Sequence, residues 1–158
     1  NRETDEWLKQ NQKSTREFLR KWGHFCKHDA LMKPIVPPKY DIGFIVKNSR
    51  DVQLIKALEP WCSTIYVDNN RSHYIDLEQS NTSFNLSERV LPYDNEKNNN
   101  ILVEIDGTTI TQQDFQIINQ LAEIIQDSGE IGEFKVSNLK VTVIELKTYE
   151  NNLIINEG

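Results

Sequence analysis

A strand, a short helix and a second strand follow one another early in the chain. Residues 41–47 form a nearly continuous apolar run, as in a strand buried on both faces. Apolar side chains then recur at helical spacing over 52–58, Pro60 stops that helix, and residues 63–68 give a second strand. This β-α-β pattern predicts parallel strands joined by a right-handed crossover, with both following loops at the carboxyl edge of the sheet, where α/β proteins bind ligands.

The remainder of the body predicts further strands and one strong helix. Residues 69–100 are rich in Asn, Ser, Asp and Glu and predict mostly loop, with one short strand. Residues 101–105 alternate as a strand does, Thr111 caps a helix expected over 112–127, and Gly129 is expected to end it. Three more strands are expected, over 134–136, 139–143 and 153–156. We therefore predict a small three-layer α/β domain with a mixed, mainly parallel sheet.

A basic helical arm precedes this domain. Residues 4–28 contain no Pro and carry apolar side chains on one face, which predicts a helix that docks on another surface. The proline-rich segment 33–38 favours an extended connector. We place the boundary there, with the arm over 1–33 and the α/β domain over 34–158.

The charge of the chain limits its partners. The net charge is −6, but residues 1–50 hold 11 Lys/Arg against 6 Asp/Glu, whereas residues 51–158 hold 7 against 18. An acidic body repels phosphate backbones, so no nucleic-acid partner is expected. The basic first third could contact an acidic surface, a phosphate-bearing ligand or an anionic membrane surface, or could simply be a solvated helix.

Hydropathy and cysteine content indicate the compartment. Every apolar stretch of the sequence is far shorter than the roughly 18 residues that a membrane-spanning helix needs. The two cysteines, Cys26 and Cys62, do not have a metal-binding spacing, and so few cysteines fit a reducing compartment. We therefore expect a cytoplasmic protein with no transmembrane segment.

Candidate substrate-binding residues follow the two strands of the β-α-β unit. The turn over 47–50 lacks the glycines that let a backbone close on a diphosphate, so dinucleotide and ATP chemistry are not favoured. Asp68 ends the second strand, where nucleotide folds place a ribose-binding acid, although a turn-capping Asp is the alternative. The candidates are Lys47, Asn48, Asp68 and Asn69. No arrangement for nucleophilic catalysis occurs, and no catalytic residue is assigned.

The densest group of metal-ligand types is His24-x-Cys26-x-His28. On a helix, His24 and His28 would share a face at i, i+4, which is compatible with a metal pair. That face offers no third ligand. The alternative is a histidine pair favoured by the dipole at a helix C-terminus.

The arm also carries a family resemblance. The motif Phe18-Leu19-Arg20-Lys21-Trp22-Gly23, within a charged helix, resembles the last helical segment of bacterial family 2 glycosyltransferases of the inverting, nucleotide-diphospho-sugar type. Residues 33–44 and 58–66 look like the segment that follows that domain in some gut-bacterial members. The resemblance implies that the chain is the C-terminal portion of such an enzyme.

The same resemblance implies what the chain lacks. Such transferases need an Asp-x-Asp motif for metal and diphosphate, and none occurs here: residues 68–70 have the wrong chemistry and 104–106 lie in an exposed-looking strand. The catalytic domain would then lie upstream, and Mn²⁺ or Mg²⁺ would be used only if that domain completed a site. A terminal-helix histidine can complete the metal site in related transferases, so the resemblance carries a metal role onto His24.

Three functional hypotheses follow. The first is a non-catalytic accessory domain of a glycosyltransferase in surface-polysaccharide synthesis, which holds a glycan acceptor or partner while its arm packs on the upstream catalytic domain. The alternative is a free-standing interaction or regulatory domain that recruits a partner through its sheet edge and acidic surface. A third is an intact small enzyme with an enclosed pocket near Asn48 and Asp68. An exposed apolar stripe on Leu8, Leu19 and Trp22 would indicate a severed domain interface.

Overall fold

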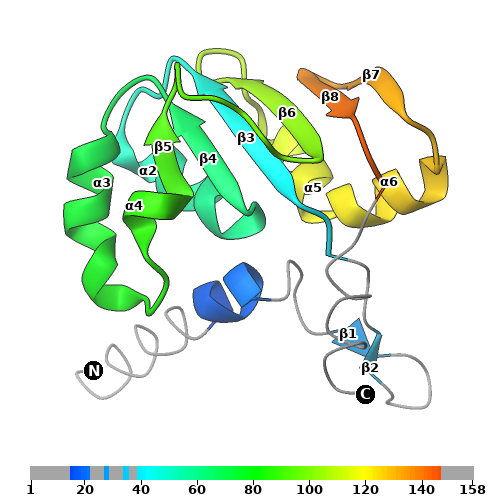
Figure 1. The fold of residues 1–158 in the computed structure, drawn as a ribbon. Coiled ribbons are helices and arrows are strands. Elements are labelled where there is room, and N and C mark those ends of the chain that lie inside the picture. Colours follow the sequence, from blue (N-terminus) through cyan, green and yellow to red (C-terminus); the bar gives the residue numbers. More distant parts are fainter. Residues whose placement is uncertain (1–14, 22–26, 29–33, 36–38, 147–158) are drawn as a thin grey trace.

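The computed structural model describes residues 15–21, 27–28, 34–35 and 39–146 (Figure 1). Six strands form one sheet in the order β5-β4-β3-β6-β8-β7. Their bounds are β3 (Ile42–Lys47), β4 (Thr64–Val67), β5 (Val90–Pro92), β6 (Ile101–Asp106), β7 (Gly132–Val136) and β8 (Leu139–Val143). The first four of these strands are parallel, and β8 runs antiparallel to both β6 and β7. The predicted α/β class with a mixed, mainly parallel sheet is confirmed.

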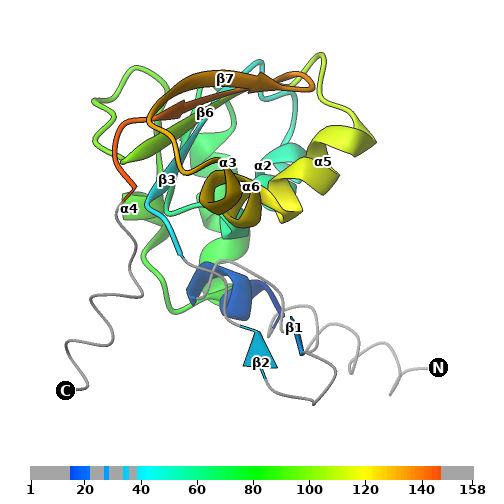
Figure 2. The ribbon, with the colours of Figure 1, turned by 90° about the vertical axis from the view of Figure 1, so that its right-hand side faces the viewer.

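The helices of the body connect these strands. They are α2 (Val52–Leu58), α3 (Arg71–Glu78), α4 (Leu86–Arg89), α5 (Gln112–Asn119) and α6 (Leu121–Ser128), with 3₁₀ turns at Glu59–Trp61 and Gln79–Asn81. Figure 2 shows α2, α5 and α6 on one face of the sheet. The segment 93–100, which joins β5 to β6, crosses the opposite face. In the described part of the chain, the third layer of the domain is therefore this loop and not a layer of helices.

Alternation along the strands places the core on the helical face. In β3, Phe44 and Val46 are fully buried, whereas Ile45 between them is only partly buried and Lys47 is exposed. Because successive side chains of a strand point to opposite faces, the even-numbered residues of β3 meet the helices. The odd-numbered ones meet the opposite face, which segment 93–100 crosses and which we call the open face. Ile55 of α2 packs in the same core. The open face is therefore where polar side chains of the central strands gather.

Local sequence determines where the helices begin and end. Asp51 caps α2 by accepting a hydrogen bond from the backbone N–H of Leu54 at 3.1 Å. Thr111 and Asp114 form a reciprocal capping box at the start of α5. Gly129 ends α6 in the left-handed conformation, with φ +60°. The helix predicted over 112–127 is two helices, because the chain departs from helical geometry at Gln120.

The segment predicted as mostly loop is more regular than its composition indicates. Residues 69–100 contain α3, α4 and β5. Helix α3 is held by Tyr74, which is buried and donates a hydrogen bond from its hydroxyl to Glu59 Oε1 at 2.8 Å. Helix α4 is capped by Asn85, which accepts from the N–H of Ser87 at 3.0 Å. The prediction of loop was wrong because tertiary contacts, and not apolar periodicity, stabilise α3.

The arm is helical over 15–21, but the helix predicted over 4–28 does not reach its expected end. Strand β1 (Lys27–His28) pairs antiparallel with β2 (Pro34–Ile35), and an extended residue 28 removes the helical i, i+4 spacing proposed for two histidines. Backbone pairing with β2 thus replaces the last helical turn. The expectations for residues 4–14 and 22–26, and for a strand over 153–156, lie outside the described residues.

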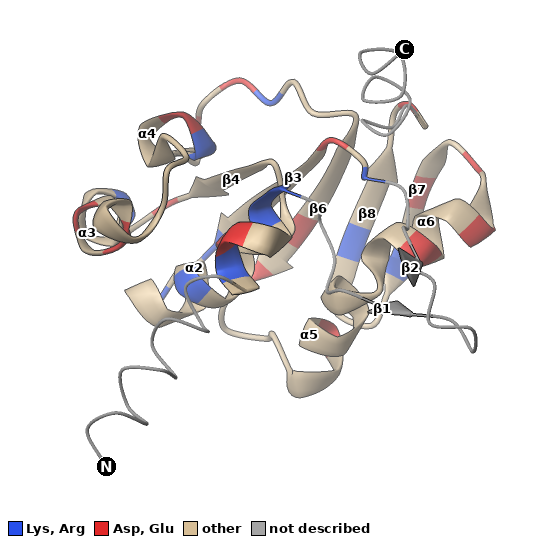
Figure 3. Ribbon diagram, turned by 90° about the horizontal axis from the view of Figure 1, so that it is seen from below, with Lys and Arg blue, Asp and Glu red and all other residues tan. Residues whose placement is uncertain are grey.

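Helix 15–21 packs on the body through buried charges. Arg20 is 1% exposed and donates two hydrogen bonds from its Nε and one from Nη2 to the carboxylate of Glu59, at 2.6–3.1 Å. The Nη2 group also donates to Glu78 Oε2 at 2.7 Å. Arg16 reaches the same oxygen of Glu78 at 2.8 Å, and Arg89 reaches Glu59 Oε2 at 2.9 Å. We call these five residues the arginine–glutamate network; Figure 3 shows both signs of charge where helix 15–21 meets the body.

This network changes the interpretation of the arm. Leu19, one of the three residues proposed to form an exposed stripe, is 4% exposed and packs within this chain. The other two, Leu8 and Trp22, lie outside the described residues. The described part of the arm is therefore bound to the α/β body itself, and its buried face is not available to an upstream domain.

Candidate functional site

The site lies where the strand order reverses. From β3 the chain adds β4 and then β5 on one side, and it returns through 93–100 to add β6 on the other side of β3. In open α/β sheets, the crevice at the carboxyl ends of the strands at such a switch point is where ligands bind. The residues that end or follow β3, β4 and β6 therefore form the candidate site.

Four polar residues from these three strand ends form one hydrogen-bonded group, the switch-point cluster: Asn48, Ser49, Asp68 and Asp106. The backbone N–H of Asn48 donates to Asp68 Oδ2 at 2.7 Å, and its side-chain amide donates to Asp106 Oδ1 at 3.0 Å. Ser49 donates to Asp68 Oδ1 from its N–H at 3.0 Å and from its hydroxyl at 2.7 Å. Asn48 thus connects two carboxylates that lie 38 positions apart in the sequence.

The backbone at Asn48 is special in two ways. It has φ +57°, a left-handed conformation that Asn tolerates better than most residues, and this turns the chain so that its side chain reaches β6. A Cβ at Gly107 would lie 2.1 Å from the carbonyl oxygen of Asn48, so only glycine fits there. The N–H of Gly107 also donates to Lys47 O at 2.8 Å. Gly107 therefore holds the loops after β3 and β6 together.

The two carboxylates are held in their charged form. Hydrogen bonds from Thr108 and Asn48 lower the pKa of Asp106 to about 2, because they favour the carboxylate over the acid. Burial raises the pKa of Asp68, but the hydrogen bonds from Ser49 and Asn48 outweigh it and bring the pKa below 3.8. Both residues are therefore anions near neutral pH.

The cluster retains capacity for a ligand. The side-chain hydrogen bonds that Asp106 accepts from Asn48 and Thr108, together with that from the Thr108 N–H, all fall on Oδ1. Its Oδ2 has no hydrogen bond within the part of the chain that the structure describes. Asn48 and Asp68 are exposed, and Asp106 is partly exposed. Asp106 thus keeps one carboxylate oxygen that no described residue hydrogen-bonds, whereas both oxygens of the exposed Asp68 already accept hydrogen bonds.

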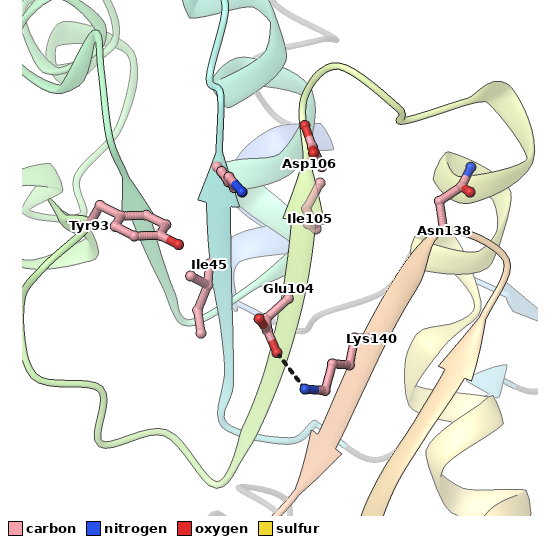
Figure 4. Close-up of a pocket in the computed structure, with 8 residues that line it drawn as sticks. Ile45, Tyr93, Glu104, Ile105, Asp106, Asn138 and Lys140 are labelled. Atoms are coloured by element: carbon pink, nitrogen blue, oxygen red, sulfur yellow. Dashed lines mark ion pairs between the residues drawn. The ribbon is translucent and has the colours of Figure 1, made fainter.

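A small pocket adjoins the cluster on the open face of the sheet. Its volume is about 180 Å³, and its lining includes Lys47, Asp106, Tyr93 and Lys140. Figure 4 shows Tyr93 across β3 from β6 and β8, and the ion pair of Lys140 with Glu104, whose atoms lie 3.5 Å apart. The pocket combines one aromatic ring with charges of both signs.

The residues predicted from the sequence as site residues do not all lie in the switch-point cluster. Asn48 and Asp68 lie together in the cluster, and Lys47 lines the pocket. Asn69 contacts the cluster through its backbone, whose N–H donates to Ser49 Oγ at 3.1 Å, whereas its side-chain oxygen accepts from the N–H of Asn70 at 3.0 Å. His24, the proposed metal ligand, lies outside the described residues. Among the residues that are described, no group of three His, Cys, Asp or Glu is arranged to hold a metal ion.

Sequence reasoning missed Asp106. Residues 104–106 were expected in an exposed strand, but β6 is a central strand between β3 and β8, with Ile101, Val103 and Ile105 buried. Asp106 is the last residue of β6, and Asp68 directly follows β4, so the two aspartates have equivalent positions at the carboxyl ends of parallel strands. That similarity was the available sign that Asp106 belongs to the site.

Comparison with protein-family models, with curated proteins and with solved structures finds no significant match. In the described ranges, no helix is both long and apolar enough to span a bilayer. The functional argument therefore depends on the geometry of the switch-point cluster and its pocket.

Proposed function

We propose that this chain is a non-catalytic accessory domain of a glycosyltransferase of cell-surface glycan synthesis, and that it holds the acceptor glycan at the switch-point cluster. The observation that carries the proposal is the junction of Asp68 and Asp106 through Asn48 at the strand-order reversal, where Asp106 keeps a carboxylate oxygen that no described residue hydrogen-bonds. Sugar hydroxyls donate hydrogen bonds that such an oxygen can accept, and hydrogen bonds to a charged acceptor are stronger than those between neutral groups.

The charge of the site favours a neutral ligand. Lys47 and Lys140 balance Glu104 and Asp106 in the pocket lining, and Asp68 leaves the site with one excess negative charge. A diphosphate is therefore disfavoured there unless a divalent cation intervenes. A neutral glycan meets no such repulsion. The nearby Tyr93, 38% exposed, offers an aromatic surface beside the pocket.

The size of the pocket favours the end of a chain over an enclosed small molecule. At about 180 Å³ the pocket is smaller than the roughly 300–1,000 Å³ of typical ligand sites. A ligand bound there lies mostly outside the pocket and contacts the switch-point cluster through Asp106, the member of the cluster that lines the pocket. Such a surface site suits an extended acceptor better than a donor that must be shielded from water.

The proposal includes a cytoplasmic location and an upstream catalytic domain as partner. Cys62, a free and buried thiol, fits the reducing conditions of the cytoplasm. Because Leu19 and Arg20 are buried within this chain, the surface that meets the catalytic domain must be another one.

The test is titration of the full chain with candidate ligands, with the NMR chemical shifts of the backbone amides as the readout. Neutral oligosaccharides of bacterial surface glycans form one arm, and nucleotide-diphosphate sugars with and without Mn²⁺ form the other. We expect oligosaccharides to shift the amides of the loops after β3, β4 and β6, and Asp106→Asn to weaken binding about tenfold or more, the size of a lost charge-assisted hydrogen bond. Glu130→Gln removes an exposed charge outside the pocket lining and should leave affinity unchanged.

Two results would overturn the proposal. Mn²⁺-dependent binding of a nucleotide sugar that needs Asp68 and Asp106 would make the cluster a donor site and the domain catalytic. Binding of neither ligand class would remove the acceptor role.

A further inference from the structure

The two edges of the sheet differ in how open they are to another strand. Edge strand β5 has only three residues and ends in Pro92, which has no N–H to donate. Edge strand β7 has five residues and no proline, and among the described residues only β8 pairs with it. Glu133 and Lys135 of β7 are exposed. The β7 edge is therefore the one that can accept a further strand.

The hairpin turn determines which backbone groups of β7 point outward. Ser137 and Asn138 form a two-residue turn, so Val136 and Leu139 are the hydrogen-bonded pair that closes it. Hydrogen-bonded and non-hydrogen-bonded pairs alternate along an antiparallel ladder. Phe134 therefore bonds inward to β8, and the N–H and C=O groups of Glu133 and Lys135 point away from the sheet.

These outward groups restrict how a second copy of β7 could pair with the first in antiparallel sense. If the pairing is centred on Phe134, Glu133 of each copy lies opposite Lys135 of the other. A centre at Glu133 or at Lys135 instead places two like charges opposite each other, which is unfavourable. One register thus satisfies both the backbone hydrogen bonds and the charges.

We infer that the chain forms a symmetric dimer by antiparallel pairing of β7 with β7 of a second copy, centred on Phe134. The occupant of this edge is a second copy because the charge pattern of β7 is complementary to itself, and a two-fold axis makes each Glu133–Lys135 pair occur twice. Backbone hydrogen bonds supply the attraction, and the two charge pairs select the register.

Sedimentation equilibrium of the full chain over a wide range of concentration tests this inference. We expect a monomer–dimer equilibrium that weakens as salt is raised, because the charge pairs are exposed. Lys135→Glu places two glutamates opposite each other at both pairs and should raise the dimer dissociation constant about tenfold or more. Glu133→Lys should do the same, although it also removes the contact of Glu133 with Lys140 at 3.7 Å. Glu88→Lys, an equal charge change on α4, is the matched control and should leave the equilibrium unchanged.

Mixing the two single variants gives the most discriminating test of the dimer. Lys135→Glu and Glu133→Lys should each be mainly monomeric alone and should dimerise with each other, because every opposed pair in the mixed dimer is again of opposite charge. The double variant Glu133→Lys/Lys135→Glu should dimerise by itself, which covers the case in which one single variant fails to fold. A chain that stays monomeric at every concentration, a dimer that neither single change weakens, or mixed variants that do not associate would each overturn the inference.

Discussion

The arginine–glutamate network and the switch-point cluster both join charged side chains from distant parts of the sequence, but they differ in exposure and in spare hydrogen-bonding capacity. In the network, Arg20 and Glu59 are almost completely buried, and several donors converge on each carboxylate. In the cluster, Asp68 is exposed and Asp106 keeps one carboxylate oxygen without a partner within the described chain. The difference separates a group of charges that fixes the fold from one that is available to a ligand.

The largest effect is expected in the network. Glu59→Gln removes the charge that faces buried Arg20 and Arg89, and breaking a buried ion pair on one side costs about 3–5 kcal/mol of unfolding free energy. Urea unfolding measures the loss. Glu104→Gln removes an exposed glutamate whose pair with Lys140 contributes at most about 1 kcal/mol. Equal losses in the two variants would contradict the role assigned to Glu59.

An intermediate effect is expected at the glycine that supports the cluster. Gly107→Ala would place a Cβ 2.1 Å from Asn48 O, and overpacking of this kind costs about 1–3 kcal/mol. It should also weaken ligand binding, because Asn48 must shift.

Gly129→Ala is the matched comparison for this change. It is strained by φ +60° at a cost of about 1–2 kcal/mol, but the nearest atom to a Cβ there is 3.8 Å away. Gly129→Ala should lower the unfolding free energy without changing the affinity for the oligosaccharide. A loss of affinity in Gly129→Ala, or none in Gly107→Ala, would show that Gly107 does not position the site.

The smallest effect is expected on acidification. Burial raises the pKa of Glu59, but hydrogen bonds from Arg20 and the charge of Arg89 outweigh it and keep the pKa below 4.5. The unfolded chain therefore binds a proton before the folded chain does, so stability is present above pH 4.5 and falls as pH drops through the folded pKa. Unfolding midpoints measured from pH 6 to pH 3 should fall less steeply in Glu59→Gln than in the unchanged chain. Parallel profiles would remove Glu59 from the acid response.

The sequence predicted the elements whose information is local. The apolar run of β3, the helix over 52–58 and the capping box at Thr111 each depend on residues within a few positions of one another, and the structure contains all three. Helix α3 was missed because Tyr74 is held by Glu59, a residue of another element. Pattern analysis within a window does not include such a contact.

The site was half predictable for the same reason. Asn48 and Asp68 were expected together because one β-α-β unit places both at a single edge. Asp106 joins them only through the pairing of β3 with β6, whose register aligns Lys47 with Asp106 across 59 positions of sequence. That parallel pairing depends on the whole sheet, and the sequence around Asp106 does not specify it.

The open face of the sheet has a consequence for avidity. In the proposed dimer, the two-fold axis through the paired β7 edges would stand perpendicular to the continuous sheet. The open faces of both copies, each with its pocket beside Tyr93 and Asp106, would then point to the same side. Surface polysaccharides are repeating polymers, and one strand of polymer could then occupy both pockets. The second contact would be intramolecular, so weak individual sites could retain a growing chain by effective concentration alone.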